Sequence, residues 1–235
     1  MRRVWAICRK ELVSYFASPV AYVIAAVFLI VSGFFFSLII AASREAHLRY
    51  VFNNMNVTLL LIAPMLTMRL FAEEKKMGTF ELLMTSPITL MELVLGKFLG
   101  AALLFLAMTA VTVEFPLFLV ALGNPDKGPL LTVYLGFALM GFAYLAVGMF
   151  ASSLTDNQIV ATIIAFGILL MLGVISWAGP QIGGPIGDFI GGISVFERFE
   201  SFSRGVLDTG DAFFYLSLAG IFIFLTVRSL DWRRW

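Results

Sequence analysis

Six long stretches of the chain are apolar and almost free of charge. A helix rises about 1.5 Å per residue, so crossing a hydrocarbon core of roughly 30 Å takes about 20 residues. The pattern predicts membrane-spanning helices over about residues 20–42, 55–70, 91–122, 129–154, 157–178 and 212–230. We therefore expect an all-α polytopic membrane protein in which residues 1–235 form a single transmembrane domain.

Helix-start signals support several of these boundaries. A proline at the first helical position, a Ser or Thr paired with Glu or Gln three residues later, and an aspartate before an apolar run are all typical of helix N-termini. In chain order the signals are Ser18-Pro19, a Thr89–Glu92 capping box, a Thr155–Gln158 box and Asp211.

Composition agrees with a membrane protein. Hydrophobic residues make up 60% of the chain and charged residues 13%, with a mean hydropathy of +0.96. This composition excludes a soluble monomer and a disordered chain. A net charge of +1 argues against nucleic acid as a partner. One Cys and one His leave no disulfide framework and no His-rich metal site.

The distribution of Lys and Arg predicts the orientation of the six spans. Cytoplasmic loops of membrane proteins are enriched in these residues. With six spans, both termini lie on one side of the membrane, and that side is the richer in cations, so we expect both termini in the cytoplasm. The termini side holds Arg2, Arg3, Arg9, Lys10, Arg69, Lys75, Lys76, Lys97, Arg228, Arg233 and Arg234, against Arg44, Arg49, Lys127, Arg198 and Arg204 opposite.

The first 18 residues have the pattern of an amphipathic helix that lies along the membrane surface. Its apolar positions are Val4, Trp5, Cys8, Leu12, Tyr15 and Phe16, and its basic positions are Arg2, Arg3, Arg9 and Lys10. Two interpretations are open: the helix anchors the topology, or it is a lever contacted by a cytoplasmic partner.

Residues 69–90 form the longest polar stretch on the predicted cytoplasmic side. Gly78-Thr79 breaks one helix, and Thr79 can cap the next. The expected short helix would show Phe80, Leu83, Met84 and Glu81 to the cytoplasm. An isolated two-turn helix is marginal in water, and it becomes useful when something docks on it. The alternative is an ordinary charged loop.

Two further features lie toward the opposite side. Residues 179–210 begin GPQIGGPIGDFIGG, which has too many Gly and Pro to continue a helix and stays apolar, so re-entrant helices are expected there. They would act as a gate or as a structural cap. Glu114 is the single acid inside the apolar run 98–122 of the third span. It is a candidate pathway residue, or an acid satisfied by backbone groups freed at Pro116.

Motifs for autonomous catalysis are missing. The sequence contains no GxxxxGK[ST], GxSxG or HExxH. We expect no enzymatic activity and no directly bound cofactor.

Several segments together resemble the permease subunits of ABC-2 type transporters. They are RKELVSYFASPVAY near the N-terminus, FAEE followed by GTFELLMTSPIT, the helix start ELVLGK, and the closing LDWRRW. The segment FERFESFSRGVLDTGDAFFYLSL looks closest to the branch of gliding motility and nitrous-oxide-reductase maturation.

The resemblance implies a subunit of a bacterial cytoplasmic (inner) membrane complex. It would pair with a second permease copy or paralogue and with two cytoplasmic ATPase subunits that carry ATP and Mg²⁺. Outer re-entrant helices would lie between spans five and six. The implied interface helix includes Trp5, Arg9, Lys10, Glu11 and Tyr15. The implied coupling helix, which fits a cleft on the ATPase, covers Glu73, Glu74, Gly78, Thr79, Glu81, Leu82, Leu83 and Pro87.

Three functions fit these features. The chain is an exporter-like subunit that couples ATP hydrolysis on a partner to substrate movement. Alternatively, the same architecture relays mechanical work to an extracytoplasmic protein. A third option is a six-helix carrier or channel without an ATPase, which would need ionisable residues along its path, and only Glu114 qualifies.

Overall fold

The computed structural model describes residues 2–43, 48–122, 126–182, 184 and 194–232. Within these ranges the chain is mostly helical and contains no strand. The helices are α1 (Arg2–Ala17), α2 (Pro19–Ser43), α3 (Arg49–Thr67), α4 (Arg69–Lys76), α5 (Thr79–Thr85), α6 (Leu90–Val111), α7 (Glu114–Leu122), α8 (Lys127–Leu154), α9 (Gln158–Ile182), α11 (Val195–Ser203) and α12 (Thr209–Asp231).

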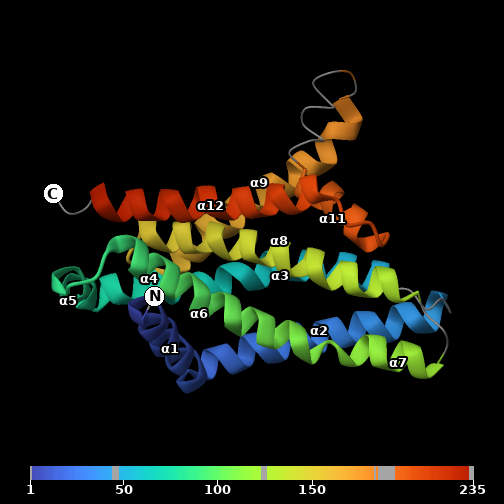
Figure 1. Cartoon of the computed structure of the whole chain (residues 1–235), viewed down its shortest axis with the longest axis horizontal. Coiled ribbons are helices and arrows are strands. Elements are labelled where there is room, and N and C mark those ends of the chain that lie inside the picture. The colour runs from blue at the N-terminus through green and yellow to red at the C-terminus, as the bar shows by residue number, and fades with distance from the viewer. Residues whose placement is uncertain (1, 44–47, 123–125, 183, 185–193, 233–235) are drawn as a thin grey trace.

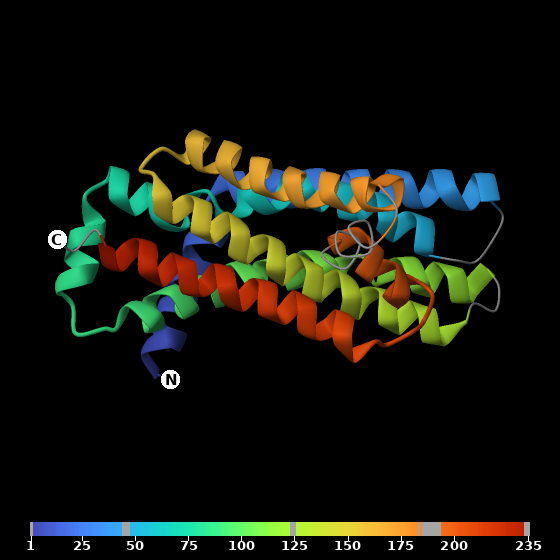
Figure 2. The same ribbon diagram turned by 90° about the horizontal axis from the view of Figure 1, so that it is seen from above.

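Six candidate membrane spans lie side by side along the long axis of the molecule (Figures 1 and 2). They are α2, α3 with α4, α6 with α7, α8, α9 and α12. This confirms the expected all-α polytopic fold. α8 is central, because it contacts α3, α4, α6, α9, α11 and α12. α2 and α9 bury little surface, so their apolar sides face outward.

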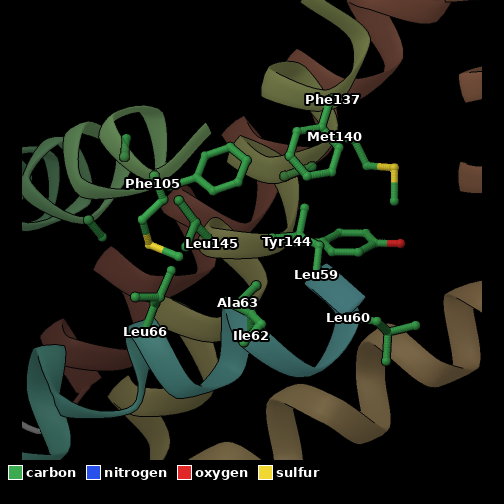
Figure 3. Close-up of a cluster of buried hydrophobic side chains, with 14 of the residues drawn as sticks. Leu59, Leu60, Ile62, Ala63, Leu66, Phe105, Phe137, Met140, Tyr144 and Leu145 are labelled. Atoms are coloured by element: carbon green, nitrogen blue, oxygen red, sulfur yellow. The ribbon is translucent and has the colours of Figure 1, made fainter. Parts of the chain in front are cut away.

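The core lies where α3 and α6 meet α8. Leu59 and Ala63 of α3 lie close to Tyr144 of α8 in Figure 3, and all three side chains are buried. Two glycines let neighbouring elements approach α8 closely: a methyl group at Gly141 would lie 2.2 Å from the Phe105 ring, and one at Gly148 would lie 2.0 Å from Thr67 Oγ1. Small residues allow such close helix packing, which is the main source of helix association in lipid.

The third span is interrupted. α6 ends at Val111 and α7 begins at Glu114, so the continuous helix expected over 91–122 is broken at Thr112. Pro116 has no N–H to donate to the Thr112 carbonyl four residues earlier, and this carbonyl accepts instead from Phe115 N at 2.9 Å and from the Tyr134 hydroxyl at 2.6 Å. Pro116 then falls in the first turn of α7, where its missing N–H costs little.

The fifth span continues further than expected. α9 runs through Gly179 and Pro180 to Ile182, so the expectation that GPQIGG stops the helix is wrong up to that residue. A proline removes one backbone hydrogen bond and can bend a helix without ending it. Residues 185–193, which hold most of the expected re-entrant segment, lie outside the described residues.

Helix starts agree with some of the expected signals. Pro19 is the first residue of α2, and the Thr89–Glu92 capping box is present, with Glu92 N donating to Thr89 Oγ1 at 3.2 Å. The expected Thr155–Gln158 box is wrong, because Asn157 Oδ1 accepts from Ile159 N at 2.9 Å and thereby caps α9. An Asx side chain one residue before the helix competes well for this position.

The start of α12 also differs. Asp208 Oδ1 accepts from Gly210 N at 2.7 Å, so Asp208 is the N-cap in place of Asp211. Asp211 lies inside the first turn and pairs with Arg198 at 2.8 Å. Its side chain is therefore occupied by a cation from α11.

Candidate functional site

Two of the predicted segments meet at one end of the helix bundle. α1 crosses the direction of the spans, and α4 and α5 project beside it (Figures 1 and 2). We call this the α5 end. The last described residues of α12 lie at the same end of the bundle.

A buried serine holds α4 against α8. Ser152 Oγ accepts hydrogen bonds from Phe71 N and Ala72 N, each at 3.1 Å, and donates to the Met68 carbonyl at 2.8 Å. These groups are left unpaired by the turn between α3 and α4, so one hydroxyl of α8 replaces helical hydrogen bonds. Lys75 of α4 also donates to the Ser153 carbonyl. α4 is thus attached firmly to the central helix.

α5 is joined to α4 by a left-handed residue. Gly78 has φ +69°, a conformation that glycine adopts without steric cost. The expectation that Thr79 caps this helix is wrong: Thr79 is its first residue, and its hydroxyl donates to the Glu74 carbonyl at 3.3 Å. The change of direction between α4 and α5 therefore takes place at Gly78.

The outward face of α5 differs in detail from the expected one. Phe80 and Leu83 pack partly against the core, and the Phe80 ring lies edge-on to Phe71 with 6.3 Å between centroids. Glu81 and Leu82 face outward, and Leu82 is 71% exposed. Because the side of α5 that carries Phe80 and Leu83 packs against the protein, Leu82 is left on the solvent side. Pro87 is exposed just beyond the helix.

A groove of about 500 Å³ lies beside α5. Its walls come from α4, α5, the connection between α8 and α9, and the end of α12, including Lys75, Glu81, Met84, Asp156 and Leu230. Segments from the middle and the end of the chain thus meet at α5.

α1 presents two different sides. Cys8, Glu11 and Tyr15 are buried, whereas Trp5 is 61% exposed and Arg9 is also exposed. The Tyr15 hydroxyl donates to the Leu66 carbonyl at 2.6 Å, and burial raises the pKa of that phenol. The expected single apolar face is therefore divided, because part of it packs inside the protein.

The main unexpected feature is a buried charge cluster between α1, α4 and α6. The Lys97 side chain is 2% exposed and lies 2.6 Å from Glu11 Oε1 and 2.9 Å from Glu74 Oε1. Lys10 lies 3.1 Å from the same Glu74 oxygen. The cluster thus joins one residue of the predicted coupling segment to two of the predicted interface helix. Its centre, Lys97, was absent from the predicted site.

The remaining predicted residues are more peripheral. Glu73 pairs within its own helix with Arg69, at 3.4 Å. Glu114 is exposed at the start of α7, toward the end of the bundle opposite α5 (Figure 1). The structure thus brings the interface and coupling residues together and leaves Glu114 away from them.

Ion pairs also fix α11 near the opposite end. Arg198 pairs with Asp211 of α12 at 2.8 Å, and Glu200 pairs with Arg49 of α3 and with Arg204 at 2.7 Å. The hydrogen bond from Arg204 lowers the pKa of Glu200 below its usual range.

Comparison with family models gives one match. Residues 35–186 match the model described as ABC-2 family transporter protein, and this range covers more than half of the chain. The chain belongs to the ABC-2 family of transporter proteins. Such proteins are membrane permease subunits, generally non-catalytic, that work with an ABC ATPase.

The match has clear limits. It includes α4 and α5, whereas α1 and α12 lie outside the matched range. It gives no support for a closer assignment of this ABC-2 permease to the gliding-motility branch. A comparison with curated proteins finds no match.

Proposed function

We propose that this ABC-2 permease is the transmembrane subunit of an exporter-like complex in the bacterial cytoplasmic membrane. Two ATPase subunits would bind ATP and Mg²⁺ below α5, and closure of the ATPases would move the spans. The observation that carries the proposal is α5 itself. It contains no buried residue, it is joined to α4 by the left-handed Gly78, and α4 is attached to the central α8. A displacement of α5 can therefore be transmitted through α4 to the core of the helix bundle.

The exposed chemistry of α5 suits docking on a protein. Leu82 offers an apolar side chain and Glu81 a carboxylate, and an exposed apolar residue beside a charge is typical of an interface anchor with a polar rim. The groove beside α5 widens the contact to Met84 and Asp156.

Copurification with the cognate ATPase tests this proposal. Leu82→Glu places a charge in the docking face and should reduce ATPase retention at least tenfold, which corresponds to about 1.4 kcal/mol of binding free energy. Leu207→Glu is the matched control, because Leu207 is 61% exposed and follows α11 in the chain. Equal retention by the two variants would contradict docking at α5, and failure of the wild type to bind any ATPase would overturn the proposal.

A second permease copy would cover the face formed by α2, α3 and α9. A groove of about 490 Å³ there is lined mainly by apolar side chains, but it includes Asn54, Thr58 and Thr162. Asn54 and Thr58 donate to carbonyls of α3, and Thr162 donates to the Gln158 carbonyl of α9 at 2.9 Å. The Asn54 amide is still poorly suited to lipid, and a neighbouring subunit would remove it from lipid.

Cross-linking tests the pairing. Val57 is 58% exposed and lines this groove, so Val57→Cys should form a disulfide-linked dimer in membranes. Phe213→Cys is the control, since Phe213 is 73% exposed on α12. Cross-linking through position 213 and not through position 57 would place the second copy elsewhere.

The same architecture also fits mechanotransmission to an extracytoplasmic partner. This alternative and the gliding-motility branch are supported by the resemblance of residues 196–218, which form α11 and the start of α12. ATP-dependent movement of a defined substrate into vesicles would favour export. Activity of the purified chain without ATP would favour an ATPase-independent carrier or channel.

A further inference from the structure

Lys97 stands where three helices of different predicted roles meet. Its ammonium group takes one carboxylate from α1 and one from α4, while its own backbone belongs to the membrane-spanning α6. It also lies 5.3 Å from the centre of the Phe71 ring. The side chains of Glu11 and Glu74 are 8% and 13% exposed, so water screens this cluster weakly.

Two glycines on either side of Lys97 bring α1 into direct contact with α6. A methyl group at Gly96 would lie 2.7 Å from Ile7 Cβ, and one at Gly100 would lie 2.7 Å from Glu11 Cβ. Any larger side chain would therefore push α1 away. The close approach is what allows the short Glu11 side chain to reach the Lys97 ammonium group.

Glu74 gives the cluster its connection to the coupling segment. It lies near the end of α4 that carries α5, whereas Arg69 contacts Ser14 of α1 from the other end of α4. The neighbouring Glu73 pairs only within α4 in the described ion pairs, and its side chain is 39% exposed. The two adjacent glutamates thus have the same chemistry and different connections.

We propose that Lys97, Glu11 and Glu74 form an ionic clamp that makes α1, α4 and α6 move as one body. The clamp rests on the proposed function, because its role is to pass a displacement of α5 to the spans. Separating the pairs would leave buried charges without a partner, which is far more costly than sliding one apolar surface over another. The clamp therefore positions the coupling segment and takes no part in ATP chemistry.

Distance measurements between spin labels test the clamp. Labels at Val13→Cys in α1 and Met77→Cys after α4 report whether the two elements move together, and both positions are more than 60% exposed. The native Cys8 stays in place, because it is buried and burial raises the pKa of its thiol, which slows labelling. Each distance is measured in the permease alone and in the ATPase complex, with and without ATP.

Glu74→Met is the test variant and Glu73→Met its matched control. The Lys97–Glu11 pair remains in Glu74→Met, so the fold should survive. We expect a narrow distance distribution for the wild type and Glu73→Met, unchanged by ATP. In Glu74→Met the distribution should broaden in the permease alone and shift with ATP by about one helical turn, roughly 5 Å. ATPase retention is measured in parallel, and the distributions of the permease alone are interpreted independently of it.

Each other outcome is informative. A wild-type distribution in Glu74→Met, or equal broadening in Glu73→Met, overturns the clamp even if the ATPase binds normally. If no ATPase binds the wild type, the proposed function fails, and the distributions of the permease alone still decide whether the clamp exists. If Glu74→Met does not fold, Glu74→Gln replaces it, because it keeps the shape of the side chain and loses the charge. Its distribution should broaden less, and an unchanged one overturns the clamp.

Discussion

Gly100 shows that close helix packing in this protein depends on individual glycines, which have no side chain. Its α-carbon faces Glu11 so closely that a methyl group would lie 2.7 Å from Glu11 Cβ. Alanine normally favours a helix over glycine by about 1 kcal/mol. At this position the steric conflict with a neighbouring helix outweighs that preference.

We predict that Gly100→Ala destabilises the packing of α1 by about 1–3 kcal/mol, the usual cost of overpacking. The measurement is thermal unfolding in detergent, together with protease sensitivity of the N-terminal segment. Gly220→Ala in α12 is the control, because nothing lies within 4 Å of the added methyl group. The close α1–α6 contact would be refuted by equal or higher stability of Gly100→Ala relative to Gly220→Ala.

Some of these residues could be read from the sequence and some could not. Helical spacing is enough to predict an amphipathic helix over the first 18 residues, and Cys8 and Tyr15 of its expected apolar face are buried. The sequence identifies Lys97 only as a cytoplasmic cation, because a lysine near the end of an apolar run is typical of a topology signal. Its partners Glu11 and Glu74 lie far away in the sequence, and no local pattern reports that they converge. The flanking Gly96 and Gly100 were the available sign of close packing.

At the scale of elements, breaks were harder to predict than helices. The break before α5 follows from Gly78-Thr79, since glycine tolerates the left-handed turn. The break at Thr112 lies four residues before Pro116, whose ring conflicts with the carbonyl at that position of a continuous helix, so the sequence did carry a signal for it. The continuation of α9 past Pro180 went against local composition. Tertiary contacts can override local preference in such a place.

The turn at Gly78 yields a second prediction. A side chain at φ +69° costs roughly 1–2 kcal/mol, so Gly78→Ala should shift the α4–α5 junction toward a right-handed turn. Nothing lies within 4 Å of the added methyl group, so the effect would come from the backbone alone. We expect weaker ATPase retention with unchanged thermal stability of the spans. Undiminished retention would show that docking does not require this turn.

The stability of α11 depends on pH through the carboxylate of Glu200. The pKa of Glu200 is lowered in the folded state, first by the hydrogen bond from Arg204. The ion pairs of Glu200 therefore give their full stabilisation above the pKa of an unfolded glutamate, about 4.3. This stabilisation is lost as the pH falls through the lower pKa of the folded state. We predict faster amide hydrogen exchange in α11 on acidification, after correction for the intrinsic rate. In Glu200→Gln this step should disappear, and an identical acid response in both proteins would exclude Glu200 as its cause.

At the scale of the whole molecule, the distribution of charge and the arrangement of the helices predict the same orientation in the membrane. α1, α4 and α5 gather at one end of the bundle with the last turn of α12 (Figures 1 and 2). Most of the Lys and Arg residues belong to these elements or to the chain ends. The positive-inside rule concerns short loops and residues near the ends of spans, which is where these cations lie. The α5 end should therefore face the cytoplasm, where an ATPase can reach it.

Cysteine accessibility in intact cells and in inverted vesicles tests this orientation. Met77→Cys, at the α5 end, should react with a membrane-impermeant maleimide only in inverted vesicles, and Leu207→Cys only in intact cells; both side chains are more than 60% exposed. The buried Cys8 provides the unlabelled background. The opposite pattern would place α5 outside the cell, where no ATP is available, and would remove the basis for coupling through α5. Labelling of both positions from one side would contradict the arrangement of the spans itself, because three spans (α6 with α7, α8 and α9) lie between the two positions in the chain.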